Sequence, residues 1–252
     1  MSESSLNQQI EHYLETLRLN HIKLTYHDLV AQAEKGKLTY QEFLALLLQE
    51  ECSKKYDKSV QRRISHAKFP FIKTIEAFDF SFQPSLNQQQ IIQLSSLQFV
   101  QDHHNIILLG PPGVGKTHLA VALGIKACMA QMRIAFFTVQ DIVNELVIAE
   151  KNNQLLNRLL FYSRFHLLII DELGYRPICN HAANLLFQLV SIRYEKGSII
   201  LTSNFNFDDW GRFFPDSTVA SAIIDRLVHH ADIFFINGSS YRIKDKIRNP
   251  ES

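Results

Sequence analysis

The spacing of apolar residues changes at about residue 68. Before this point apolar residues recur three and four positions apart, as at Leu14 and Leu17 and again within residues 43–48. This spacing predicts amphipathic helices, and the segment contains no run typical of a strand. We therefore expect residues 1–68 to form a small all-α domain.

Two threonines in this segment have an acidic residue three positions later, Thr25 before Asp28 and Thr39 before Glu42. This spacing is typical of a helix N-terminus, because each side chain can accept a hydrogen bond from the other residue's backbone N–H. We expect helices to begin at both threonines.

A phenylalanine-rich stretch bounded by prolines follows, and we expect residues 69–95 to be an irregular linker that packs on the next domain. Five short apolar runs then alternate with helical patterns, which predicts an α/β fold with a five-stranded parallel sheet between helices. Runs without polar alternation fit strands that are buried on both faces. The runs lie in a second domain, residues 96–252, at Asn105–Leu109, Arg133–Thr138, Leu167–Ile170, Ser198–Thr202 and Ile233–Ile236.

The composition is that of a globular protein, with 46% hydrophobic and 20% charged residues in a chain of 252. It excludes collagen-like, coiled-coil and disordered classes. No apolar run reaches the ~18 residues that a membrane span requires, and the polar start has no signal-peptide pattern. We expect a cytoplasmic protein that does not contact a membrane.

Cysteines and histidines are not spaced as metal ligands. Cys52, Cys128 and Cys179 are far apart and form no pair that suggests a zinc site or a disulfide framework. The histidine pairs His103-His104 and His229-His230 also lack a metal-site spacing, so we expect surface or helix-end positions for them.

The net charge of +1 conceals a basic segment between Cys52 and Lys68. Such a density of positive charge either contacts a nucleic-acid backbone or forms a solvated helix face. The candidate DNA contacts in this segment are Lys54, Lys55, Lys58, Arg62 and Arg63.

The first strand-like run leads directly into a glycine-rich loop and then into a helical pattern that begins at His118. The loop reads Gly110-Pro111-Pro112-Gly113-Val114-Gly115-Lys116-Thr117, which is the phosphate-binding motif GxxxxGK[ST] (Walker A) in its strand–loop–helix context. Its glycines let backbone N–H groups face an anion, Lys116 supplies a positive charge, and Thr117 offers a hydroxyl to Mg²⁺. We expect residues 110–118 to bind a nucleotide.

The run Leu167–Ile170 ends in Asp171 and Glu172, as a Walker B strand does. Ligands of open α/β folds bind at the carboxyl ends of the strands, so we expect Asp171 to hold Mg²⁺ and Glu172 to polarise a water molecule. An adjacent glutamate favours nucleotide hydrolysis over small-molecule phosphorylation. The alternative is an acidic pair that only solvates the edge of the sheet.

Three polar residues near the last two strands have a less specific pattern. Asn204 follows the fourth run and is either a turn residue or, if that strand lies between the two motif strands, a ligand of the γ-phosphate or of the attacking water. Arg226 precedes the last run and Arg242 follows it, and surface arginines are common at such positions.

The ordered set GPPGVGKT, LLIIDELGY, FQLVSIRYEKGSIILTSNFNFDDWG, AIIDRLVHH and GSSYR resembles the IstB-type transposition helper ATPases. This family is a branch of the AAA+ helicase-loader clade that also contains DnaC. The resemblance covers about residues 6–246 and implies an AAA+ P-loop NTPase fold with ATP and Mg²⁺ as cofactors. It further implies that Asn204 is sensor 1, Arg226 an arginine finger given to a neighbouring subunit's nucleotide, and Arg242 the sensor-2 arginine.

The same resemblance gives expectations for DNA and for the adenine. The segment Asn152–Arg164 matches an extra helix with which this clade reaches DNA, which makes Arg158 a candidate contact, and Phe80 corresponds to a position beside the adenine. The sequence departs from the family pattern at His166 and at Asn180-His181, where acidic residues are usual. We expect no separate helical lid after Arg242, so that a neighbouring subunit completes the site.

These patterns together predict an ATP-dependent, DNA-binding homo-oligomer that hydrolyses ATP and assists a transposase, with residues 1–68 as the partner-binding domain. The nearest alternative is a DnaC-like loader of a replicative helicase, which shares the ATPase core. A DNA scaffold that binds ATP without hydrolysis is disfavoured by Glu172 and Arg226, and a small-molecule kinase by the basic segment and Asn204.

Overall fold

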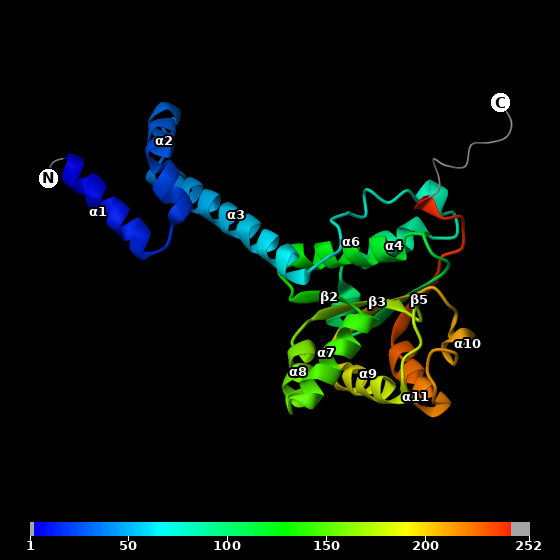
Figure 1. The fold of residues 1–252 in the computed structure, drawn as a ribbon. Coiled ribbons are helices and arrows are strands. Elements are labelled where there is room, and N and C mark those ends of the chain that lie inside the picture. Colours follow the sequence, from blue (N-terminus) through cyan, green and yellow to red (C-terminus); the bar gives the residue numbers. More distant parts are fainter. Residues whose placement is uncertain (1–2, 243–252) are drawn as a thin grey trace. The chain divides into compact units, whose positions relative to one another are not determined.

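The computed structural model describes residues 3–242 and divides into two compact units, Met1–Arg62 and Arg63–Ser252 (Figure 1). We call these the N-terminal unit and the C-terminal unit. The first is helical throughout its elements and the second carries the sheet. The N-terminal unit contains α1 (Glu3–Thr16), α2 (Asn20–Gly36) and most of α3 (Tyr40–Ala67).

One of the two predicted helix starts is confirmed and the other is wrong. At Thr39 the capping box forms, since the Glu42 N–H donates to Thr39 Oγ1 at 3.3 Å and the Thr39 N–H donates to Glu42 Oε2 at 2.7 Å. Thr25 lies inside α2, where its hydroxyl donates to the His21 carbonyl at 3.0 Å. Helix α2 begins earlier because the buried carboxylate of Glu51, on α3, accepts hydrogen bonds from its first N–H groups.

The five-stranded parallel sheet of the C-terminal unit is confirmed, with strand order β2-β3-β4-β1-β5. Only β1 has the predicted bounds: β2 begins one residue later and β4 ends one residue later than predicted, β3 continues beyond the acidic pair to Leu173, and β5 begins at Ala231 and ends before Ile236. The strands are β1 (Asn105–Leu109), β2 (Ile134–Thr138), β3 (Leu167–Leu173), β4 (Ser198–Ser203) and β5 (Ala231–Phe235).

Helices cover both faces of the sheet (Figure 1). One face packs on α6 (Lys116–Met129) and on the segment that leads to β1. That segment contains η1 (Phe80–Phe82), α4 (Gln88–Leu94) and α5 (Gln98–Gln101). The other face packs on α7 (Val139–Lys151), α8 (Leu155–Ser163), α9 (Asn180–Arg193), the short α10 (Phe207–Trp210) and α11 (Ser217–Val228).

Side chains of β1, which lies between β4 and β5, alternate between two hydrophobic clusters. Ile106 and Leu108 point into the cluster beneath α6, and Ile107 and Leu109 into the cluster beneath α7, α9 and α11. Each of these residues is 0% exposed, which explains why the strand reads as an unbroken apolar run. Among residues 3–242 no helix is both long enough and apolar enough to cross a membrane.

The strand order determines where the polar ends of the strands lie. Strand β4 lies between β1 and β3, so the ends of these three strands meet at one edge of the sheet, which we call the carboxyl edge. Ligands of open parallel sheets bind at this edge. The glycine-rich loop, the acidic pair and Asn204 therefore share one neighbourhood.

Candidate active site

The glycine-rich loop joins β1 to α6 and has room only for glycine at three positions. Gly110, Gly113 and Gly115 have φ values of 148°, 85° and 103°, a region that other residues rarely adopt. A Cβ atom at these positions would lie 2.1 Å from the Ile236 carbonyl oxygen, 2.0 Å from Ser240 Oγ and 2.5 Å from the Phe78 ring, respectively. The segment after β5 and the segment before β1 thus enclose the loop.

Lys116 begins α6 and is only 6% exposed. Its ammonium group donates hydrogen bonds to the carbonyls of Gly110 at 2.6 Å and Pro111 at 2.8 Å. Burial lowers the pKa of Lys116 to about 8, while the negative charge of Asp171 opposes this shift and the positive charge of Arg242 adds to it. A buried cation with so few compensating charges is suited to an anionic ligand.

Asp171 is 4% exposed and lies directly beside Thr117. The Thr117 hydroxyl is 3.0 Å from one carboxylate oxygen and 3.2 Å from the other. The hydroxyl of Thr202 on β4 donates to the same carboxylate. Burial raises the pKa of Asp171, and the hydrogen bonds from Thr202 and Thr117 and the charge of Lys116 act in the opposite direction.

Glu172 sits in a β-bulge. The β3–β4 register runs from Ile170 opposite Leu201 to Leu173 opposite Ser203, so Asp171 and Glu172 share one partner, Thr202. Glu172 has a left-handed φ of 64°, and its N–H donates to the Thr202 hydroxyl at 3.0 Å. The bulge turns the Glu172 side chain out of the sheet and into solvent, next to the buried Asp171.

Arg242 approaches the glycine-rich loop, whereas Arg226 packs elsewhere in this chain. Next to Arg242, the Tyr241 N–H donates to the Gly113 carbonyl at 3.0 Å. Arg226 donates to the Ala222 carbonyl at 3.2 Å, and its guanidinium lies 4.5 Å from the centre of the Phe187 ring on α9. Asn204 is half-buried directly after β4 at the carboxyl edge.

Aromatic residues before β1 form a wall beside the start of α6. Phe78 contacts Gly115, and its ring lies 4.9 Å from that of Phe80 and 5.2 Å from that of His118. The His118 Nε2 is hydrogen-bonded to the Thr74 carbonyl at 2.8 Å. Burial lowers the pKa of His118, so this ring is neutral at neutral pH. Within this wall Phe78 is buried against Gly115, whereas Phe80, which was predicted to lie beside the adenine, is half-buried on its outer side.

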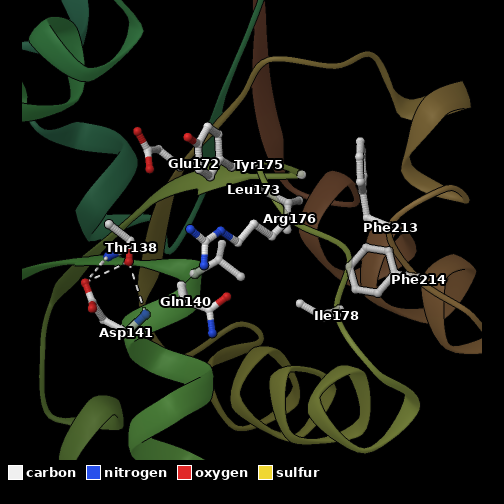
Figure 2. Close-up of a pocket in the computed structure, with 12 residues that line it drawn as sticks. Thr138, Gln140, Asp141, Glu172, Leu173, Tyr175, Arg176, Ile178, Phe213 and Phe214 are labelled. Carbon is white, nitrogen blue, oxygen red and sulfur yellow. Dashed lines mark hydrogen bonds between the residues drawn. The ribbon is translucent and has the colours of Figure 1, made fainter.

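A cavity of about 290 Å³ lies on the other side of Glu172, toward β2. Figure 2 shows the Arg176 side chain reaching across it toward Thr138 and Gln140, while the Glu172 carboxylate points away from it. Phe213 and Phe214 line the opposite wall. No residue of the glycine-rich loop lines this cavity, so it is separate from the phosphate-binding position.

Sequence reasoning missed Thr202 and Phe78. Thr202 looked like part of an apolar strand, yet it is the one residue that hydrogen-bonds both the Asp171 side chain and the Glu172 backbone in the described structure. A hydroxyl two positions before Asn204, directly after the apolar run Ile199–Leu201, is the signal that could have found it. Phe78 is indistinguishable by sequence from its phenylalanine neighbours.

The basic segment does not present all its charges in the same way. Lys54, Lys58 and Arg62 are exposed and follow one another at four-residue steps on α3, so they share one face of that helix. Lys55 is 3.4 Å from the Glu51 carboxylate. Arg63 donates to the Gln131 side chain and to the Met132 carbonyl, both at 3.1 Å, which anchors it within the C-terminal unit.

Arg158, the candidate contact on α8, is also engaged. Its guanidinium pairs with the Glu145 carboxylate and lies 4.7 Å from the centre of the Phe161 ring. The same carboxylate accepts a hydrogen bond from the Tyr162 hydroxyl. These partners hold Arg158 between α7 and α8.

The residues at the carboxyl edge fit both expected ligands. A hydroxyl and a carboxylate 3.0 Å apart, Thr117 and Asp171, are oxygen donors of the kind that Mg²⁺ prefers. The glycine backbone and Lys116 suit the phosphates of a nucleotide. The geometry therefore supports a nucleotide site with a divalent cation beside it.

Comparison with known proteins agrees with this geometry. The family model described as IstB-like ATP-binding protein matches residues 12–249. The chain belongs to the IstB family. The family model is described as ATP-binding, and similar proteins are named for insertion sequences, in agreement with the resemblance of the motifs.

Two IstB relatives illustrate the likeness along nearly the whole chain. The ATP-binding protein named for insertion sequence IS21 of Pseudomonas aeruginosa is 44% identical over 94% of this chain and 90% of its own length. The corresponding protein of IS232 from Bacillus thuringiensis subsp. berliner is 42% identical over 94% and 95%.

Solved structures confirm the AAA+ P-loop fold of this IstB protein. The AMPPCP-bound DnaA of Aquifex aeolicus matches with a TM-score of 0.57 and 21% identity over 71% of this chain and 54% of that one. The crystal structure of DnaI matches with a TM-score of 0.56 and 19% identity over 71% and 98%. These likenesses concern the fold alone.

Proposed function

We propose that this IstB protein is a Mg²⁺-dependent ATPase that assembles as a homo-oligomer on DNA and assists a transposase. The observation that carries the proposal is the contact of Thr117 with the buried Asp171, with the Glu172 carboxylate exposed next to it. Hydrolysis of a phosphoanhydride needs a carboxylate that binds Mg²⁺, here Asp171, and next to it a base that faces solvent and can accept a proton from water, here Glu172.

Each residue of the site has a distinct task. Residues 110–118 bind the triphosphate, with Lys116 neutralising its charge, and Phe80 borders the adenine. Mg²⁺, held through Thr117 and Asp171, withdraws charge from the phosphate oxygens when it is bound. Glu172 accepts a proton from the attacking water, Asn204 orients that water, and Arg242 stabilises the charge that develops on the phosphates.

Arg226 supports the oligomeric part of the proposal. In its own chain the guanidinium contacts the Phe187 ring and the Ala222 carbonyl rather than the glycine-rich loop. We assign Arg226 to another subunit's nucleotide, as an arginine finger. An arginine supplied in this way typically accelerates hydrolysis by about 10³–10⁵-fold. Hydrolysis is then coupled to assembly.

DNA and the transposase are the proposed macromolecular partners. The exposed face of Lys54, Lys58 and Arg62 contacts phosphates without reading sequence. Lys55, Arg63 and Arg158 are further candidate contacts, each considered by itself. Residues 1–68 bind the transposase, residues 69–95 link this domain to the ATPase domain at 96–252, and the protein acts in the cytoplasm. Relatives named for insertion sequences favour a transposase over the replicative helicase of the alternative, a DnaC-like loader.

The test separates nucleotide binding from hydrolysis. Glu172→Gln should bind ATP with near wild-type affinity, because Glu172 does not contact the phosphates, and should lose turnover by at least about a hundredfold. Lys116→Ala should lose binding, and Glu34→Gln, an exposed acid of the N-terminal unit, should match wild type. Equal loss of ATP binding in Glu172→Gln and Lys116→Ala would refute the assignment. Wild-type turnover in Glu172→Gln would refute it as well.

A further inference from the structure

Three histidines and a glutamate gather at the amino edge of the sheet, opposite the candidate active site. Glu195 lies in the turn between α9 and β4, while His229 and His230 lie between α11 and β5. These three residues each offer one ligand atom, and the three atoms lie within 4.8 Å of one another. The ring of His104, just before β1, stacks on that of His230 at 5.5 Å with 10° between the planes.

The backbone that carries the two histidines is firmly held. Asn105, 8% exposed at the start of β1, donates its N–H to the His230 carbonyl at 2.7 Å. Its side-chain amide donates to the Leu227 carbonyl at 3.0 Å and accepts from the Ile199 N–H at 2.9 Å. One buried asparagine therefore ties the end of α11 to both β1 and β4.

The turn that carries Glu195 is held by a second buried side chain. Arg193, 1% exposed, donates across the turn to the Ser198 carbonyl at 2.7 Å and to the Tyr162 carbonyl at 2.7 Å. The N–H groups of Lys196 and Gly197 donate back to the Arg193 carbonyl at 2.9 and 3.1 Å. The exposed side chains of Glu195 and His229 and the half-buried side chain of His230 are thus brought together on two well-anchored backbone segments.

The hydrogen bonds of the cluster orient its donor atoms. His230 Nε2 is 3.3 Å from the Glu195 carboxylate. His229 Nδ1 is hydrogen-bonded at 2.7 Å to the hydroxyl of Tyr194, so Nε2 is the atom of this ring that remains for a metal ion. A hydrogen bond to the second ring nitrogen is the usual companion of a histidine ligand.

We propose that Glu195, His229 and His230 bind a divalent transition-metal ion of the zinc class, with water in the remaining position. Two imidazoles and one carboxylate match the ligand preference of Zn²⁺ and disfavour Mg²⁺ and Ca²⁺, which prefer oxygen. Ligand atoms at about 2.0–2.2 Å from Zn²⁺ lie roughly 3.4 Å apart in a tetrahedron. Closing the present separation of up to 4.8 Å requires each ligand atom to move by about 1 Å, which side-chain rotations on a fixed backbone can supply.

Such an ion would fasten the α9–β4 turn to the end of α11. Arg226 lies one turn earlier on α11, so the ion would limit the movement of the helix that carries this arginine. Binding itself is independent of nucleotide hydrolysis and is tested without it.

The decisive experiment is calorimetric titration of Zn²⁺ into the tag-free full-length protein, without nucleotide and with Mg²⁺ in excess to fill the oxygen-ligand site at Thr117 and Asp171. We expect one Zn²⁺ per chain. His229→Ala, His230→Ala and Glu195→Gln should each lower the affinity at least about tenfold, and Tyr194→Phe about tenfold. His66→Ala removes an exposed histidine outside the cluster and should bind as wild type does.

Heat denaturation gives a second readout that does not depend on heats of binding. Zn²⁺ at about a hundredfold excess over its Kd should raise the Tm of the wild type by roughly 5–10 °C and leave the His229→Ala/His230→Ala double variant unchanged. Without zinc, the two proteins should melt within about 2 °C of each other, because the replaced side chains are at the surface. Absence of zinc binding by the wild type overturns the proposal, and so does undiminished binding by the double variant.

Discussion

Replacing Thr202 by valine removes one hydroxyl from the floor of the candidate active site and leaves the volume of the side chain almost unchanged. The hydroxyl donates to the Asp171 carboxylate and accepts the Glu172 N–H, so the change breaks both hydrogen bonds. The first is worth about 1.5–3 kcal/mol, and an N–H left without a partner costs about 1–3 kcal/mol. Water replaces part of the second loss because the Glu172 side of the bulge is exposed.

We therefore expect Thr202→Val to lower the free energy of unfolding by about 2–4 kcal/mol and the Tm by roughly 5–15 °C. Glu172 loses its backbone anchor, so kcat should fall by about 10–100-fold, or about 1.4–2.7 kcal/mol. The dissociation constant of ATP should change less than about threefold, because no phosphate ligand is removed.

The pH profile adds a readout that a purely structural role would not move. The Thr202 hydroxyl stabilises the ionised form of Asp171, so its loss raises the pKa of this carboxyl further above its usual range. The acid limb of the pH–rate profile should then move to higher pH in Thr202→Val, and Thr202→Ser should restore both the limb and kcat. A folded Thr202→Val protein with wild-type kcat and an unmoved acid limb would show the reasoning to be wrong. Failure of Thr202→Ser to rescue would show the same.

Three further predictions concern charge. ATP affinity should fall as the pH rises above about 8, by roughly tenfold at pH 9, because Lys116 must be protonated to pair with phosphates and its pKa is about 8; fluorescent-nucleotide titration at pH 7 and pH 9 checks this, and equal affinities would contradict it. Replacing Lys54, Lys58 and Arg62 by alanine should reduce the slope of log K for DNA against log salt by about 0.9 per lost phosphate contact; an unchanged slope in fluorescence-anisotropy titrations would assign these residues to a solvated face. Mixing Arg226→Ala subunits with Lys116→Ala subunits should restore ATP hydrolysis that neither has alone, because the intact glycine-rich loop of the first variant can pair with the intact Arg226 of the second at a subunit interface. Mixtures that stay inactive, together with a wild-type turnover per subunit that does not depend on protein concentration, would exclude an arginine finger supplied by a neighbouring subunit.

Most of the sheet could be predicted because its strands are buried on both faces. Asn105–Leu109 was predicted with the observed bounds, since a glycine-rich loop ends it and the apolar run is unbroken. The acidic pair was located at a strand end, but β3 continues to Leu173. A strand that resumes after a bulge has no local signal, because the bulge depends on the partner strand.

The start of α2 could not be predicted from the sequence because it depends on a contact between residues that are far apart in the chain. The start of α2 depends on Glu51, which is 29 residues away from Ile22 in sequence and accepts its N–H at 2.9 Å. Local capping patterns favoured Thr25 because Asp28 follows it by three positions, whereas Asn20 is followed at that spacing by Lys23. The histidine cluster was not predicted for the same reason: the fold of the sheet brings Glu195 next to His229 although 33 residues separate them in the sequence.

The bulge in β3 has a consequence for how this protein can change. In a regular strand Leu173 would point to the same face as Ile169, yet it packs in the cluster that holds Ile170, because one extra residue resets the alternation. Glu172 is in effect an insertion into a strand that is complete without it, and its left-handed backbone is one that glycine adopts more easily. Loss of this glutamate should leave the two hydrophobic clusters intact, so a lineage could abandon hydrolysis and keep a stable, nucleotide-responsive scaffold in one mutational step.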